Sequence, residues 1–201
     1  MRRSGHHIHA VSLSGLPEVA ASGRHDSAAL MRAAGLDPEV AGRSGVQIPF
    51  DAFCRLLESC AASWPVPDLG LRMAPYQHLE VLGPVALATR MEPTVRTALR
   101  AISKNLTLHS SALVATLEEA AGSPVAAIVL ETLPQDVPVR QYHELALAVA
   151  RNILEQISGR RLRPAEVTFR HEDCGSARAA AASFRCPVRF GAGRTALYFA
   201  A

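Results

Sequence analysis

The sequence is poor in aromatic residues, in lysine and in long apolar runs, and each shortage excludes a class of protein. Aromatic residues make up 5% of the 201 residues, and Lys104 is the single lysine. With a net charge of +3, the chain lacks the basic stripe that nucleic-acid binding requires. No run approaches the roughly 18 apolar residues of a membrane span, and no apolar run follows the basic start, as it would in a signal peptide. These absences predict a cytoplasmic protein.

Cysteine is sparse and shows no metal-binding or redox spacing. The four cysteines, Cys54, Cys60, Cys174 and Cys186, form no CxxC pair. We interpret them as reduced thiols, the usual state in a cytosolic protein.

The first residues carry a histidine cluster without a helical or strand period. His6, His7 and His9 lack a nearby carboxylate or cysteine that would complete a metal shell. We therefore expect no metal site there, a loose arm over residues 1–16, and a single domain over residues 17–201.

Apolar residues at steps of three and four predict helices through the first half of the chain. Helices are expected over 26–35, 48–64, 79–90 and from about 93 to 106. Asp26 is a suitable N-cap for the first helix, and Gly35 is suited to end it. The Gly83–Pro84 dipeptide must kink or split the third.

The period changes after residue 110. Alternating apolar residues over 113–117 and 125–129, joined by the turn "AAGSP", predict a β-hairpin. A long helix over 139–158, a strand ending near His171, a short helix and two final strands follow. The order predicts an α+β fold, with N-terminal helices and a small, mainly antiparallel sheet of about five strands packed by the long helix.

Catalytic chemistry finds little support in the sequence. His171, Asp173 and Cys174 are too close along the chain to converge as a nucleophilic triad. The nucleophile-elbow, zinc-protease, Walker and dinucleotide-binding patterns are all absent from the sequence. We expect a protein that is not an enzyme.

Several segments, taken in order, resemble one known family. They are "IPFDAFCRLLESCA", "DLGLRMA", "LGPVALATRMEPTVRTALRAISKNLTLHSSAL", "RQYHELALAV", "VTFRH" and "FRCPVRFGAGRTALYF". Together they resemble the arabinose-binding-type input half of AraC-family transcriptional regulators, from about residue 25 to residue 201. Two positions depart from the family pattern: Arg185 stands where the family usually has Gly, and Thr195 where Asn is usual near the last strand.

The resemblance implies a regulatory domain over residues 17–201 that senses a small-molecule effector. It also implies control of a DNA-binding helix-turn-helix half that is absent from this chain, so DNA would be contacted only through that half. A homodimer is among the expected partners, and membranes are not. Because family members respond to varied effectors, the sugar in the family's label does not transfer to this chain.

Five residues are candidates for contact with the effector, because each is a polar or aromatic side chain on or beside an apolar stripe. They are Trp64, Arg90, His109, Tyr142 and Glu144. Each also has an ordinary structural interpretation, such as core packing, a helix cap or a solvated helix position. A hollow for the effector is expected between the helices before the hairpin and the long helix after it.

Two alternatives remain open at this point. The first is a haem- or metal-binding sensor, with His109 or His143 as the axial ligand, although the sequence calls for no cofactor. The second is a dimerisation module without a ligand. His171 shares a strand face with Val167 and Phe169, and we expect it to be a core histidine bonded to a backbone carbonyl.

Overall fold

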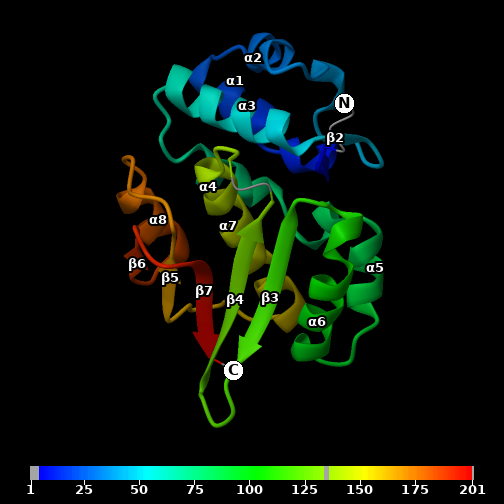
Figure 1. Ribbon diagram of the computed structural model, residues 1–201, viewed down its shortest axis with the longest axis vertical. Coiled ribbons are helices and arrows are strands. Elements are labelled where there is room, and N and C mark those ends of the chain that lie inside the picture. The colour runs from blue at the N-terminus through cyan, green and yellow to red at the C-terminus, as the bar shows by residue number, and fades with distance from the viewer. Residues whose placement is uncertain (1–4, 134–135, 201) are drawn as a thin grey trace.

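The computed structural model describes residues 5–133 and 136–200. A layer of N-terminal helices lies across one end of a sheet, and further helices cover one face of that sheet (Figure 1). The N-terminal layer contains α1 (Leu16–Gly23), α2 (Ser27–Ala33), α3 (Phe50–Ser63) and the paired strands β1 (His7–His9) and β2 (Gln47–Pro49). The remaining helices are α4 (Leu69–Met73), α5 (Pro84–Arg90), α6 (Val95–Asn105), α7 (Arg140–Ser158) and α8 (Ala177–Phe184).

The larger sheet has five strands in the order β3-β4-β7-β5-β6. Their bounds are β3 (Leu113–Glu119), β4 (Val125–Thr132), β5 (Glu166–Thr168), β6 (Val188–Arg189) and β7 (Thr195–Ala200). All neighbours are antiparallel except β5 and β6. The α+β class and the mainly antiparallel sheet are therefore confirmed. Among the described residues, none of the helices combines the length and the apolar character that crossing a bilayer demands.

Local signals in the sequence set several element boundaries as predicted. The Asp26 side chain caps α2 by accepting a hydrogen bond from the Ala29 N–H at 3.1 Å. Gly83 and Pro84 split the third expected helix into a 3-10 turn, η4 (Leu79–Leu82), and α5. At the start of α6, Thr94 and Thr97 form a capping box, which was not predicted from the sequence.

The predicted loose arm over residues 1–16 is wrong from His7 onward; residues 1–4 lie outside the described part of the chain. β1 pairs with β2, and the turn η1 (Ala10–Leu13) follows it directly. Ile8 and Leu13 are fully buried, and the His9 N–H bonds to the His109 carbonyl at 3.0 Å. No periodic pattern marks this segment, because its partners, β2 and His109, lie far along the chain.

Helix α4 approaches α7 at Gly70 more closely than any side chain would allow. The Gly70 N–H donates to the Gln141 side-chain oxygen at 2.7 Å. A Cβ added at Gly70 would lie 2.1 Å from the Gln141 backbone carbonyl oxygen. Glycine is therefore required here by close packing and not by its backbone angles.

We expect Gly70→Ala to lower the free energy of unfolding by about 3 kcal/mol or more, because α4 must move off α7. Urea denaturation measures the loss. Gly193→Ala is the matched control, since a Cβ at Gly193 meets nothing within 4 Å. Near-equal stability of the two variants would contradict the close approach.

The departure at position 185 falls where the backbone favours glycine. Arg185 follows α8 and adopts the left-handed conformation, with φ of 57°. Its side chain is exposed. The left-handed conformation costs roughly 1–2 kcal/mol for a residue with a Cβ, so the structure gives a physical reason for a glycine here.

Arg185→Gly should raise the free energy of unfolding by about 0.5–1 kcal/mol, since relief of strain outweighs the greater freedom of glycine in the unfolded chain. Thermal denaturation provides the measurement. Arg178→Gly, at an exposed position inside α8, should instead lower it by about 1 kcal/mol. The same sign for both changes would rule out strain at Arg185.

Candidate ligand-binding site

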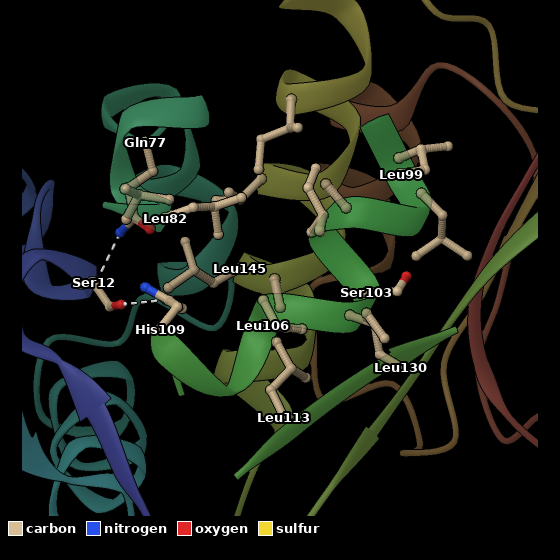
Figure 2. Close-up of a pocket in the computed structure, with 18 of the residues that line it drawn as sticks. Ser12, Gln77, Leu82, Leu99, Ser103, Leu106, His109, Leu113, Leu130 and Leu145 are labelled. Carbon is tan, nitrogen blue, oxygen red and sulfur yellow. Dashed lines mark hydrogen bonds between the residues drawn. The ribbon is translucent and has the colours of Figure 1, made fainter. Parts of the chain in front are cut away.

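A hollow of about 90 Å³ lies between α6, α7 and the inner face of the β3–β4 hairpin (Figure 2). This is the place where the sequence led us to expect one. Its apolar wall comes mainly from Leu99, Ile102, Leu106, Leu113, Ala115, Leu117, Ile128, Leu130, Leu145, Ala146, Val149, Ala150 and Ile153. On α7, the small side chains of Ala146 and Ala150 face the hollow and leave it room.

The polar groups of the hollow gather mainly at one end, where Ser12, Gln77 and His109 meet (Figure 2). The His109 Nε2 lies 3.3 Å from the Ser12 hydroxyl oxygen. The Gln77 amide donates to the backbone carbonyls of Ser12 and Ser14, both at 2.8 Å. These bonds hold the N-terminal segment against this end of the hollow.

All three residues are buried. His109 has the largest solvent-accessible fraction of the three, at 6%. Its Nδ1 has no hydrogen-bond partner of good geometry among the described residues. Burial and the neighbouring His9 lower the pKa of His109 to about 4, against a smaller opposing effect of the Val81 carbonyl. The ring is therefore neutral at pH 7 and offers one nitrogen as donor or acceptor.

Tyr142 also lines the hollow, at the N-terminal end of α7. Its ring packs edge-on against Phe50 and Phe53, with centroids 5.0 and 5.8 Å away. Burial raises the pKa of Tyr142, with a smaller opposing effect of Ser110. The phenol therefore stays protonated and joins the N-terminal layer to the hollow by packing.

The hollow is small, and leaving it empty lowers the free energy of unfolding of the protein. At roughly 24 cal/mol per Å³ of cavity, about 90 Å³ corresponds to about 2 kcal/mol of lost packing. A cavity of about 150 Å³ admits benzene, so a larger molecule requires the walls to move apart. Filling the space would recover this free energy, which gives an apolar ligand a reason to bind.

Two of the five predicted residues, His109 and Tyr142, line this hollow; Trp64, Arg90 and Glu144 do not. Trp64 stacks on His25 at the far end of α3, with ring centroids 5.0 Å apart. Arg90 pairs with Glu80 and lies along a surface groove between α5 and the end of α7. Trp64, Arg90 and Glu144 therefore lie outside the hollow and apart from one another.

Glu144 is fully buried on the side of α7 that faces α8. One of its oxygens accepts a hydrogen bond from the Ser176 hydroxyl at 2.6 Å, and the other has no partner among the described residues. Burial raises the pKa of Glu144 to about 7, against opposing effects of Ser176 and Arg140. The solvated helix position considered from the sequence is excluded.

His171 lies beside Glu144, with its Nε2 3.9 Å from the carboxylate. Its Nδ1 lies 3.0 Å from the Glu172 carbonyl, so the expected backbone partner is present, but the residue is only partly buried and does not lie in the core. Burial lowers the pKa of His171, so a neutral ring faces the carboxyl group of Glu144.

The two histidines considered as haem ligands have different surroundings. Both nitrogens of His143 lie near threonine hydroxyls, Thr132 at 3.3 Å and Thr195 at 3.5 Å. His109 faces a hollow of about 90 Å³, which is too small for a haem, because a cavity of about 150 Å³ admits only a molecule the size of benzene. Over residues 5–133 and 136–200, no group of three or more His, Cys, Asp or Glu side chains is placed to hold a metal ion.

Several residues of the hollow carry no signal in the sequence. Ser12 and Gln77 lie in segments without a period, and they reach the site only through the fold. Ser103 is a polar position on α6, beside the predicted apolar stripe. Its place in the helix could have suggested a role, but nothing distinguished it from a solvated serine.

Comparison with known proteins shows which family this fold and hollow belong to. Residues 25–201 match the family model described as the arabinose-binding domain of AraC transcription regulators, N-terminal. The chain belongs to this family. The family and its relatives are transcription regulators, which confirms both the resemblance and the prediction that the chain is not an enzyme.

Two relatives show how much of such a regulator the chain represents. It is 30% identical over 185 residues to the HTH-type transcriptional regulator VirS of Mycobacterium tuberculosis, covering 92% of this chain and 54% of VirS. The structure is similar to that of the transcriptional regulator CdpR from Pseudomonas aeruginosa, with a TM-score of 0.61 and 16% identity over 87% of this chain and 53% of CdpR. The chain therefore spans about half the length of these relatives.

The buried carboxyl of Glu144 predicts a pH-dependent difference between the wild type and Glu144→Gln. Because the folded-state pKa is raised, the folded protein binds more protons than the unfolded chain between about pH 4.5 and 7. Glu144 therefore stabilises below this window, and the stabilisation is lost as pH rises through it. The free energy of unfolding of Glu144→Gln, relative to that of the wild type, should rise by about 2–3 kcal/mol between pH 4.5 and pH 8.

The measurement is urea denaturation of both proteins at several pH values. The buried histidines destabilise the protein as pH falls. This contribution cancels when the free energy of unfolding of the variant is subtracted from that of the wild type at each pH. Glu155→Gln is the control, because Glu155 is a partly exposed residue of the same helix. A difference between wild type and Glu144→Gln that does not change with pH would contradict the raised pKa.

Proposed function

We propose that this chain is the effector-sensing input domain of an AraC-type regulator, and that its effector binds in the hollow between α6, α7 and the β3–β4 hairpin. The observation that carries the proposal is an apolar hollow with one unpartnered polar atom, the His109 Nδ1, at its polar end. Small-molecule sites combine an apolar wall with a few convergent polar groups in this way. Of the five residues selected from the sequence, His109 and Tyr142 remain in the proposed site.

A ligand in the hollow would affect the contacts between the hollow and the N-terminal layer. Ser12 belongs to the turn that follows β1, and it lies beside the His109 ring. The His109 carbonyl also accepts the backbone bond from His9. A ligand that engages His109 would therefore change the contacts that position β1 and η1 on the rest of the domain.

In the whole regulator, this change would act on an attached helix-turn-helix half or on a contact between two copies. The supporting fact is that the aligned part of this chain covers only 54% of VirS and 53% of CdpR, both transcriptional regulators. The required coupling free energy is modest, about 1–3 kcal/mol. We place such a regulator in the cytoplasm, where its DNA is.

The test is ligand-dependent stabilisation of the chain and its loss when the hollow is filled. A metabolite panel is screened by thermal denaturation, and a ligand at 100 times its Kd should add about 2.7 kcal/mol. Ala146→Met places a flexible helix-forming side chain in the hollow. It should raise the melting temperature of the free protein and abolish the ligand effect.

Ala182→Met on the exposed face of α8 is the matched control. It should leave both the melting temperature and the ligand effect unchanged. A ligand that stabilises the wild type and Ala146→Met equally would bind elsewhere and would refute this location of the site.

A further inference from the structure

Among the residues that the structure describes, none of those lining the hollow has a charged side chain. The polar residues that line it are Ser12, Gln77, Ser103, His109 and Tyr142, and all others are apolar. His109 is neutral at pH 7 because its pKa is lowered to about 4. An ionised group on a ligand would therefore lose its water without gaining a counter-ion, which is a large cost. The hollow selects against phosphates, carboxylates and ammonium groups.

Most of the polar capacity of the wall is already used by the protein. The Gln77 amide donates to two backbone carbonyls, and Ser12 is the neighbour of the His109 ring. The free capacity that remains is chiefly the His109 Nδ1 at one end, together with the Ser103 hydroxyl on α6. A sugar buries several hydroxyls at once, and each one without a partner opposes binding. The hollow is therefore unsuited to a pentose or other polyol.

A second hollow of about 230 Å³ adjoins the first, and His109 does not line it. Leu99 of α6 and Leu117 of β3 line both. The second hollow reaches Phe199 and Ala200 at the end of β7. Its far wall is again apolar, and includes Leu154 and Leu162.

An ion pair stands at the rim of the second hollow. Arg96 of α6 donates to the Glu119 carboxylate of β3 at 2.6 Å. This pair joins the helix to the hairpin where the two hollows approach the surface, so it limits how far an apolar chain can extend. The two hollows together have one polar end near His109, an apolar middle part, and a far end bordered by the Arg96–Glu119 ion pair.

We propose that the effector is an uncharged amphiphile, with a single polar group that hydrogen-bonds His109 and an unbranched apolar chain that passes Leu99 and Leu117 into the second hollow. This inference rests on the proposed function and narrows it to one class of ligand. It assigns the head group to His109 and the length limit to the second hollow.

The probes are 1-alkanols from six to fourteen carbons, titrated into the 201-residue chain by calorimetry and followed by thermal denaturation. Affinity should rise about fourfold per added CH₂, as expected for burial of apolar surface, and then level off when the second hollow is full. At pH 8, decanoate should bind at least about tenfold more weakly than decanol, and arabinose should not bind. Rising affinity without a plateau would indicate micelle-like adsorption and overturn the proposal.

Leu117→Phe tests the passage between the two hollows. It should leave hexanol binding within about twofold and shorten the chain length at which the affinity levels off. Leu99→Phe, on the opposite wall, should do the same if Leu117→Phe does not fold. Leu87→Phe is the matched control, because Leu87 is 68% exposed on α5. An unchanged plateau in a folded passage variant would overturn the path proposed for the chain.

The head group is tested with 1-chloroalkanes, which match the alkanols in length but donate no hydrogen bond. Wild type should prefer the alkanol by about three- to tenfold. His109→Phe should abolish this preference while keeping chloroalkane affinity. Equal binding of the two series by the wild type would overturn the role of His109, even if the variant fails to fold.

The outcomes also separate this inference from the proposed function. If a charged or polyhydroxylated metabolite stabilises the chain and Ala146→Met abolishes its effect, the site stands and the ligand class is wrong. If no alkanol binds and no metabolite effect responds to Ala146→Met, both are wrong.

Discussion

Most residues of helix α7 are buried, so its buried polar side chains need hydrogen-bond partners inside the protein. Gln141 bonds to the Gly70 N–H and to the Pro67 carbonyl. Glu144 accepts a hydrogen bond from the hydroxyl of Ser176, the residue just before α8. Asn152 donates hydrogen bonds to the carbonyls of Ala74 and Gln77. These bonds point in different directions around the helix. They fix the neighbours of α7 in position, since a buried polar group without a partner costs about 1–3 kcal/mol.

The hollow follows from how this helix is packed. Where α7 meets α4, Gly70 lets the two backbones approach closely. Where α7 faces α6 and the hairpin, Ala146 and Ala150 are too small to fill the space left by the larger residues around them. The helix is held rigidly on its polar sides and left underpacked on its alanine side. Hydrogen bonds on the other sides of α7 oppose a shift of the helix into this space.

The N-terminal layer is joined to the hollow at a few points of different chemistry. His109 touches it through Ser12 and through a backbone bond to His9, while Tyr142 packs on the aromatic rings of α3. Both residues were selected from the sequence because a polar group on an apolar stripe needs a partner. Trp64 and Arg90 were selected by similar reasoning, and the structure places them in stacking and ion-pair contacts elsewhere. The sequence pattern therefore identified residues with unusual surroundings without showing which of them share a site.

The sequence by itself determined the features that depend on near neighbours along the chain. Among these are the cap at Asp26, the break at Gly83 and Pro84, the alternation of the hairpin and the apolar stripe of α7. Tertiary structure alone decided the rest. The pairing of β1 with β2, the burial of Glu144 beside His171, the close approach at Gly70 and the meeting of Ser12 with His109 all join segments far apart in sequence. Local periodicity reports which face of an element is buried, whereas the packing of distant segments decides what it is buried against and where space remains.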